Sequence, residues 1–465
     1  CALALIAISY KFIWTPLTAK IDEKYIVWTI SAIMLIISIA WVSTSQTRPE
    51  ADQAFVIDDA RAAALYDDWS DFGVEGYMTR CYHNVGMFNV MYLLSMLSPD
   101  GYHFFLILNS IAYVGIFLLI YFILLKLRQS ALTRYIYIIA YLLCLPAFFY
   151  ITYYYGEITS TFMSLCVVYA TLHFLELKHD DNKRNYMVKY SCLYLLLVLT
   201  SYFSLLLRLN IIVVLIAIIL YLALITIKNF NKRHLVAISA ILLGMLLYFT
   251  NSDIFVRSHY ERYDAILSLA YIAMGLEANS NGYGAFSAFN STIFIDNGYN
   301  KEIATELSIE RIDKVLNYYL ANPREGINFF KEKITWQWVD PTFNCFHCTS
   351  SFDSKGLIQD IYYGSLRAPL YDFMNGWLNV VYLGLLVACL LNLRKNEHSV
   401  GLFIPIIFIG YFLFCIIWEA KPRYMFMCFV LMIPFASYGI SQLLSLIQNF
   451  IGHALHNISD KKDSV

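Results

Sequence analysis

Several charged residues of this sequence lie beside or inside long apolar stretches, where a charge is costly unless it has a task. Asp52 follows the apolar stretch that ends near residue 44, and Glu157 ends the short polar break Tyr155-Gly156-Glu157 between two other stretches. Arg208 interrupts an apolar run that is too long for one membrane span. Charged residues in such places usually face protein or water and indicate a functional site.

Acid–base catalysis and anion binding are the reactions open to these side chains. The carboxylate of Asp52 could act as a general base or bind a metal ion, and partial burial would raise its pKa toward neutrality. The guanidinium of Arg208 matches the oxygens of a phosphate. Each residue also has a simpler interpretation, as a helix N-cap (Asp52), a solvated turn residue (Glu157) or a structural ion pair (Arg208).

A second polar turn, Glu419-Ala420-Lys421-Pro422-Arg423-Tyr424, separates the last two apolar stretches. Its two cations and one anion could hold the phosphate of a lipid. The alternative is an anchor at the membrane surface, where Arg, Lys and Tyr are common. Cys345 and Cys348 form a single C-x-x-C pair, which favours a disulfide or free thiols over a zinc site.

The composition predicts an all-α polytopic membrane protein. Apolar residues make up 59% of the 465 residues and charged residues only 14%, whereas soluble domains have about 25% charged residues. The net charge of −1 argues against nucleic acid as a partner. With about 20 residues per span, we expect 11 spans, at residues 1–17, 25–44, 102–126, 135–154, 158–177, 187–205, 209–227, 234–251, 373–393, 400–418 and 424–447.

Lys and Arg gather in every second connection between these spans, and the positive-inside rule places such connections in the cytoplasm. The residues concerned are Lys20, Lys24, Lys126, Arg128, Arg134, Lys178, Lys183, Arg184, Lys189, Lys228, Lys232, Arg233, Arg394, Lys395, Lys461 and Lys462. The same alternation places residues 45–101 and 252–372 on the extracytoplasmic side, together with Glu157, Arg208 and the Glu419–Arg423 turn. We therefore expect a multi-pass protein of the cell membrane with its active site on that side.

Residues 45–101, the first polar segment, must position Asp52. Its apolar spacing predicts a helix from about Gln53 to Tyr66. Residues 85–97 are apolar but short, so we expect a helix at the membrane surface and not a span.

Residues 252–372, the second polar segment, are too apolar for a free soluble domain and should fold back onto the bundle. Pro323, with Asn322 as its cap and Glu325 in a capping-box position, predicts the start of a helix. The aromatic residues of that helix suit a membrane–water boundary. The chain would thus divide into a bundle with the first polar segment (1–252), an extracytoplasmic loop domain (253–372), and C-terminal spans with a cytoplasmic tail (373–465).

Four motifs, taken in order, resemble those of the GT-C class of membrane glycosyltransferases, in particular bacterial relatives of the dolichyl-phosphate-mannose protein mannosyltransferases. Pro49-Glu50-Ala51-Asp52-Gln53 resembles the acidic motif of the first extracytoplasmic loop, and Tyr82-His83-Asn84-Val85-Gly86 resembles a Tyr-Pro-x-Asn stretch. Arg208-Leu209-Asn210 resembles an Arg-Pro-Asn element, with Leu209 where proline is usual. Glu419 to Tyr424 resembles a Glu-x-x-x-Arg-Tyr turn.

The resemblance implies a fold with extracytoplasmic amphipathic helices and a polyprenyl-phosphate sugar as the donor. Asp52 would be the base that activates an acceptor hydroxyl, and Glu157 would orient the acceptor or the sugar. Arg208 and Arg423 would stabilise the departing lipid phosphate. The substrate would also be bound by His83, Asn84, Glu419 and Tyr424.

In such a family the acceptor would be a glycan, lipid or protein of the cell envelope, and the second polar segment would select it. Some members use a divalent metal, and Asp52 and Glu157 could share Mg²⁺ or Mn²⁺ through oxygen ligands. Two other functions stay open. A transporter or flippase for a lipid-linked glycan would place charges near the midplane, and a polysaccharide polymerase or ligase would also have many spans and one large external loop.

Overall fold

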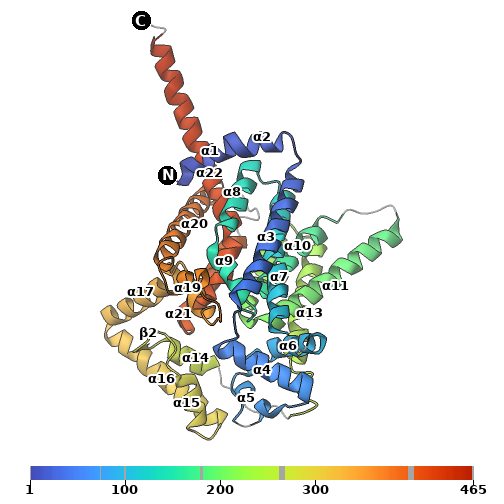
Figure 1. Ribbon diagram of the computed structural model, residues 1–465, viewed down its shortest axis with the longest axis vertical. Coiled ribbons are helices and arrows are strands. Elements are labelled where there is room, and N and C mark those ends of the chain that lie inside the picture. The colour runs from blue at the N-terminus through green and yellow to red at the C-terminus, as the bar shows by residue number, and fades with distance from the viewer. Residues whose placement is uncertain are drawn as a thin grey trace.

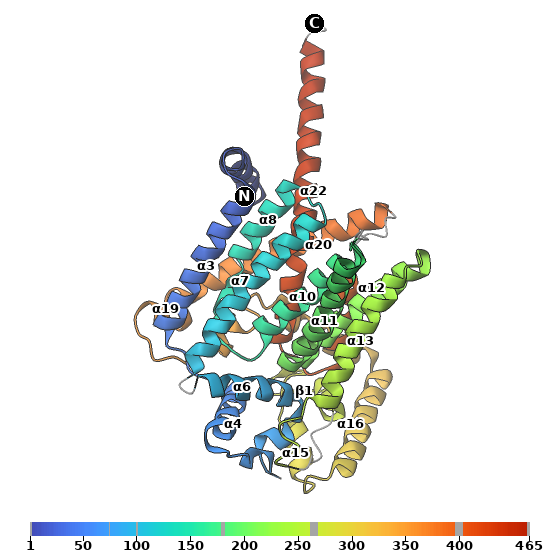
Figure 2. The ribbon, with the colours of Figure 1, turned by 90° about the vertical axis from the view of Figure 1, so that its right-hand side faces the viewer.

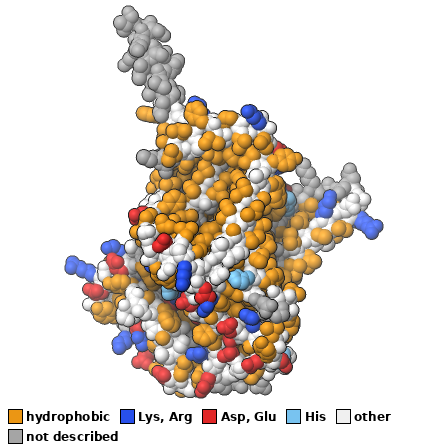
Figure 3. Space-filling model, in the orientation of Figure 1, with side chains coloured by type: hydrophobic (Ala, Val, Ile, Leu, Met, Phe, Trp, Pro, Cys, Tyr) orange, Lys and Arg blue, Asp and Glu red, His pale blue; other side chains and the backbone are white. Residues whose placement is uncertain are grey.

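Long apolar helices form the upper part of the molecule, and shorter helices cover its lower end (Figure 1). This computed structural model describes residues 2–73, 75–98, 101–177, 182–260, 268–395 and 403–462. Apolar side chains dominate the surface around the long helices, whereas acidic and basic side chains gather at the lower end (Figure 3). We call that end the polar end of the bundle.

Eight helices in the described part of the chain are long and apolar enough to cross a membrane. Helix α8 (Ala131–Leu142) is followed by α9 (Leu145–Phe149) and a short turn that ends at Thr152, with a bend of 53° after α8. If this bent pair crosses the membrane as one unit, the number of spans is nine. The eight are α3 (Glu23–Ser45), α7 (Tyr102–Lys126), α10 (Glu157–Leu175), α11 (Lys183–Leu207), α12 (Ile212–Lys228) with its preceding turn, α13 (Lys232–Asn251), α20 (Arg367–Lys395) and α22 (Arg423–Lys462). The predicted class of all-α multi-pass membrane protein is confirmed.

The expected count of eleven spans is not confirmed, because two apolar stretches form shorter helices. Residues 1–17 correspond to α1 (Ala2–Ser9), η1 (Tyr10–Trp14) and α2 (Thr15–Thr18), which lie across the end of the bundle (Figures 1 and 2). Residues 400–418 correspond to α21 (Phe403–Ile417). At about 1.5 Å per residue, both are shorter than the roughly 30 Å hydrocarbon core.

The predicted turn of the chain at Arg208 is confirmed. Helix α11 ends at Leu207, a short turn η5 (Leu209–Ile211) follows, and α12 then packs against α13 and α21. The connections between α2 and α3 and between α7 and α8 lie at the end opposite the polar end (Figures 1 and 2). Of the basic residues used for the topology, Lys178 lies outside the described residues, as do the side chains of Arg394, Lys395, Lys461 and Lys462.

Both polar segments lie at the polar end, as the alternation of the loops predicts (Figure 2). The first contains the expected helix as α4 (Ala51–Tyr66) and the expected short apolar helix as α6 (Val85–Leu97). Between them lie η2 (Ser70–Phe72), α5 (Tyr77–Arg80) and η3 (Tyr82–Asn84). Helix α4 packs mainly on α6, so Asp52 is held next to the bundle by its own segment.

The second polar segment has two parts with different cores. Its first part has a small hydrophobic cluster of its own, formed by Ala270, Ile293, Phe294 and Ala304. This part contains α14 (Ser268–Gly275), the antiparallel strands β1 (Ala278–Asn279) and β2 (Gly282–Tyr283), α15 (Phe289–Ile295) and α16 (Lys301–Ala321).

The other part contains α17 (Pro323–Val339), α18 (Cys345–Cys348) and α19 (Leu357–Tyr362). Trp338 and Phe343 of this part belong to the main core of the bundle, so this part folds back as expected.

Helix α17 begins at Pro323 as predicted, but the predicted capping does not form. Asn322 makes no capping hydrogen bond, and its side-chain amide instead donates to the carbonyl of Tyr318 at 3.0 Å. Of the aromatic residues of this helix, Phe329 and Trp338 are buried, Trp338 against Phe408 and Phe429, whereas Trp336 is exposed. Cys345 and Cys348 lie in one helical turn as free thiols, one of the two states expected for them.

One buried carboxylate of α4 forms no ion pair with a cation among the residues that the structure describes. Asp59 is buried, and its Oδ2 atom has no hydrogen-bond partner. Burial, followed by a hydrogen bond with Asp71 and the charge of that residue, raises the pKa of Asp59 to about 8. Between the unfolded pKa near 4 and this value the folded protein keeps a proton that the unfolded chain loses, so stability falls as the pH rises through that window.

We therefore expect Asp59→Asn to become progressively more stable than the unmodified protein between pH 5 and pH 9. The gain at pH 9 should reach about 1–3 kcal/mol, the cost of a poorly satisfied buried polar group. Thermal unfolding in detergent at several pH values measures it, with Asp313→Asn, exposed on α16, as the control. A difference that does not depend on pH would contradict this account.

Candidate active site

Four charged residues of the predicted site all stand where a helix begins. Asp52 lies in the first turn of α4, and Glu157 is the first residue of α10. Arg208 immediately precedes η5 and α12, and Arg423 is the first residue of α22. Helix N-termini carry a partial positive charge and free N–H groups, so these positions suit the binding of an anion.

A glycine brings two of these helix starts together. Gly156 has a φ of +95°, and a Cβ atom at this position would lie 2.2 Å from the carbonyl oxygen of Leu207. Only glycine has neither the strain of that φ nor the clash. The end of α11 therefore packs directly against the start of α10, and Arg208 reaches Glu157.

The carboxylate of Glu157 faces two guanidinium groups. Its Oε1 atom lies 3.2 Å from Nη2 of Arg208 and 3.5 Å from Nε of Arg423. Glu157 is only 1% exposed and Arg423 only 8%. The interpretation of Glu157 as a solvated turn residue is therefore wrong, while the interpretation of Arg208 as a partner of a carboxylate is correct.

Tyrosines from the turn before Glu157 hold both arginines. Arg208 donates from Nη1 to the carbonyl of Tyr155 at 3.1 Å, and its guanidinium lies 4.6 Å from the centre of the Tyr155 ring. Arg423 donates from Nη1 to the hydroxyl of Tyr153 at 2.5 Å and lies 5.3 Å from the Tyr155 ring. Cation–π contacts of this kind fix the orientation of a buried guanidinium.

Several polar atoms of this cluster have no hydrogen-bond partner. They are both carboxylate oxygens of Glu157, Nε of Arg423 and Oε1 of Glu419. Buried polar atoms are nearly always paired, and leaving one unpaired costs about 1–3 kcal/mol. Oε1 of Glu157, Nε of Arg423 and Oε1 of Glu419 nevertheless have ion-pair contacts. Of these four atoms, Oε2 of Glu157 therefore is the one that has neither a hydrogen bond nor an ion-pair contact in the described part of the chain.

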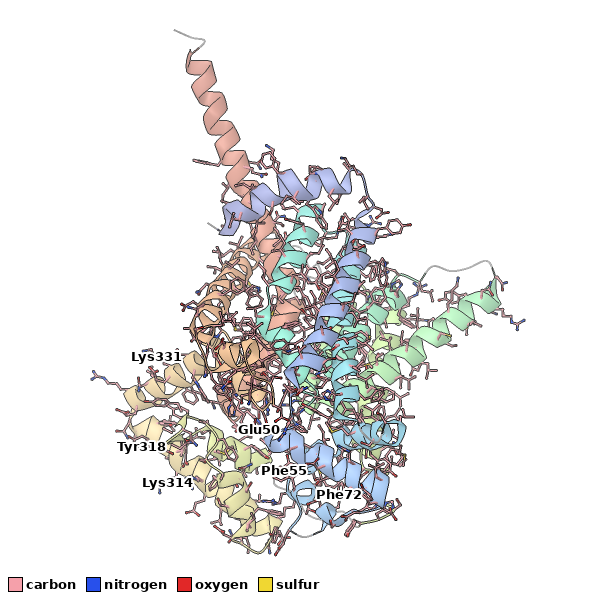
Figure 4. The ribbon with its side chains drawn as sticks, viewed as in Figure 1. Glu50, Phe55, Phe72, Lys314, Tyr318 and Lys331 are labelled. Carbon is pink, nitrogen blue, oxygen red and sulfur yellow. The ribbon has the colours of Figure 1, made fainter. Side chains whose placement is uncertain are left out.

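Asp52 is not the N-cap of its helix, because that position belongs to Glu50 (Figure 4). Its Oδ1 atom instead accepts a hydrogen bond from the hydroxyl of Tyr77 at 3.3 Å. The Tyr77 hydroxyl in turn accepts a hydrogen bond from Nδ2 of Asn84 at 3.2 Å. The ring of Phe55 stacks on the ring of Tyr77. Burial raises the pKa of Tyr77, so this phenol stays protonated and directs a hydrogen bond at the carboxylate.

His83 links the two halves of the site. Its ring is exposed, yet burial is the main cause that lowers its pKa to about 4. The charge of Asp52 opposes this decrease, and the charges of Arg208 and Lys421 add to it. All three charged groups therefore lie close to one neutral imidazole.

The polar turn after α21 completes the cluster. Glu419, 1% exposed, accepts from the hydroxyl of Tyr424 at 3.0 Å and pairs with Nζ of Lys421 at 2.8 Å. Because Glu419 and Arg423 are buried, the alternative of a membrane-surface anchor is wrong for both. Lys421 also lies over the ring of Phe286, 5.2 Å from its centre.

The structure thus brings all the proposed site residues to one region at the polar end of the bundle. Sequence reasoning missed Tyr77, Tyr153 and Tyr155, which orient the charged groups. The run Tyr153-Tyr154-Tyr155 before Gly156 was a visible signal, whereas Tyr77 carried none. The residues present do not fit the shared metal site, because Glu157 faces two arginines and no group of three or more His, Cys, Asp or Glu among the described residues could hold a metal ion.

Comparisons of the chain with protein-family models, with curated proteins and with solved structures give no match.

Replacing Gly156 should separate the two arginines from Glu157. We expect Gly156→Ala to destabilise the protein by about 1–3 kcal/mol, the usual cost of a strained backbone position. Thermal unfolding in detergent measures the loss. Gly376→Ala is the matched control, because a Cβ at Gly376 on α20 meets no atom within 4 Å. Equal stability of Gly156→Ala and the control would show that the close approach at Leu207 is not needed.

Proposed function

We propose that this chain is an integral membrane glycosyltransferase that moves a sugar from a polyprenyl-phosphate donor to an acceptor on the extracytoplasmic side. The observation that carries the proposal is the contact of two buried guanidinium groups, Arg208 and Arg423, with the single carboxylate of Glu157. At Glu157 itself two positive charges face one negative charge, whereas the charge of Glu419 is balanced by Lys421. A buried excess charge is costly without a counter-charge, and a phosphate would supply it.

The location of the cluster suits a donor that is carried by a lipid. The start of α12 and the start of α22 both lie at the polar end of apolar helices. A phosphate bound there would also receive the field of these helix N-termini. The isoprenoid chain could remain in the apolar surroundings of the bundle while its head group reached the arginines.

Asp52 is the base in this proposal. It takes the proton of the acceptor hydroxyl as the acceptor oxygen forms a bond to the anomeric carbon of the sugar. The bond between that carbon and the phosphate oxygen breaks, and its electron pair leaves with the polyprenyl phosphate. Arg208 and Arg423 stabilise the charge that develops on this leaving group. A single displacement of this kind inverts the anomeric configuration.

The remaining polar groups would orient the two substrates. Oε2 of Glu157 is suited to accept a hydrogen bond from a sugar hydroxyl. The carboxylate of Glu419 has further lone pairs beside its contacts with Tyr424 and Lys421. Tyr77 holds the carboxylate of Asp52 in one orientation. His83, neutral at pH 7 because of its low pKa, and Asn84 complete the part of the site that faces the acceptor.

A flippase for a lipid-linked glycan is the second candidate, and the bend of 53° between α8 and α9 favours it, because transporters often contain broken helices. Substrate sites of transporters lie near the midplane of the bilayer. The charged residues of this cluster instead stand at the ends of the apolar helices, which supports the transferase.

Replacing the proposed base should abolish transfer while leaving the fold intact. We expect Asp52→Asn to lower the turnover number at least about 100-fold, the low end of what general base catalysis contributes. The measurement is transfer of radiolabelled sugar from a polyprenyl phosphate to cell-envelope acceptors by purified protein. Asp58→Asn, exposed on the same helix, is the matched control. Full activity of Asp52→Asn would remove this residue from the mechanism.

Removing one guanidinium should affect the donor more than the acceptor. We expect Arg208→Ala to raise the KM for the donor by about tenfold or more, because a charge-assisted hydrogen bond contributes roughly 1.5–3 kcal/mol, with a smaller change for the acceptor. Arg324→Ala, on the exposed start of α17, serves as the control. Equal effects on both substrates would count against a phosphate-binding role.

A further inference from the structure

Lys333 of α17 is a buried lysine outside the catalytic cluster. It is 0% exposed. Its Nζ atom donates to the carbonyl oxygens of Gly275 at 2.5 Å, Ile416 at 2.9 Å and Trp418 at 2.7 Å. An ammonium group has three N–H donors, so each finds an acceptor. One side chain therefore joins the end of α14 and the end of α21 to α17.

This charge has no carboxylate in direct contact within the described part of the chain. Burial lowers the pKa of Lys333 to about 7, and the nearby carboxylate of Glu419 opposes that decrease. A buried ammonium group without an ion-pair partner is costly. An apolar side chain of similar length would fill the same space without the cost of burying a charge. Because Lys333 makes three hydrogen bonds that such a side chain could not make, we expect these bonds to be its role.

Next to Lys333, the residue that follows the β1–β2 strand pair contacts the turn after α21. The amide of Ala420 donates to the carbonyl of Gly284 at 2.7 Å. Gly284 has a φ of +70°, and a Cβ atom there would lie 2.5 Å from the carbonyl oxygen of Gly275 and 3.0 Å from Cε of Lys333. The strand pair, α14 and the turn therefore meet around Lys333 with no room for a larger residue at Gly284.

The contact has a direct connection to the site. Trp418, which accepts a hydrogen bond from Lys333, is followed by Glu419, and the ring of Trp418 stacks on Tyr271 of α14 at 5.3 Å. Tyr271 in turn contacts the ring of His83. The position of the Glu419 carboxylate thus depends on the contacts that Lys333 and Tyr271 of the second polar segment make with Trp418.

We propose that Lys333 is a positioning residue that fastens the second polar segment to the turn after α21 and thereby places Glu419 and Lys421 at the site. The contacts of Lys333 themselves fix only where the turn after α21 lies relative to α14 and α17. Its consequence for acceptor binding rests on the proposed function, because Glu419 then binds hydroxyl groups of the substrates.

Hydrogen exchange tests the structural part without any substrate. In Lys333→Met, amides of residues 276–286 and 416–423 should exchange at least about tenfold faster, the effect of losing a charged hydrogen bond. The matched control is Lys331→Met on the same helix, where the side chain is 71% exposed and points away from the protein (Figure 4). Lys333→Arg, which keeps a charged donor, should restore part of the protection. Unchanged exchange in Lys333→Met would overturn the inference.

A second variant covers the case in which Lys333→Met does not fold. Gly284→Ala crowds the same contact from the strand side, so it should raise exchange in the same two stretches. Normal protection there in Gly284→Ala would likewise overturn the inference.

Kinetics test the consequence for the substrates. With polyprenyl-phosphate sugar as donor, Lys333→Met should raise the KM for the acceptor about tenfold or more and change kcat less, with part of the loss restored in Lys333→Arg. A KM that does not move although exchange rises would overturn the link to Glu419. A purified protein that transfers no sugar at all, but loses protection in Lys333→Met, would contradict the proposed function and support the structural role of Lys333.

Discussion

The contact between Glu157 and the two arginines is the constraint on which the rest of the site depends. Three charges are placed where little water reaches them, so each must keep its partner or the arrangement becomes unstable. Gly156 permits this contact, because only a residue without a side chain lets the end of α11 approach so closely. Tyr153 and Tyr155 then fix the direction of each guanidinium.

These charged residues meet because several helices begin at the same end of the bundle. Helices α10, α12 and α22 begin there, and the turn from α21 arrives there with Glu419. The first polar segment adds Asp52, and the second contacts the site through Tyr271, whose ring meets that of His83. The site is therefore not carried by any single element, and each polar segment is needed to complete it.

The apolar pattern of the sequence predicted the elements well, because each span needs a long apolar run and each polar break must leave the membrane. It thus located Asp52, Glu157, Arg208 and the Glu419 turn. It overestimated the spans, since hydropathy alone does not distinguish a helix that lies across the end of a bundle from one that crosses it. The tyrosines and Lys333 escaped prediction because their roles depend on contacts with residues distant in the chain, such as Tyr77 with Asp52 and Lys333 with Trp418.

The separate hydrophobic cluster around Phe294 has a consequence for how such a protein can change. Because residues 268–321 are packed largely on themselves, insertions and substitutions on their outer surface hardly strain the helices in the bilayer. The chemistry near Glu157 and the exterior of this part can therefore vary independently. In a lineage with this architecture, the exterior of this part could therefore change while the helices in the bilayer stayed as they are.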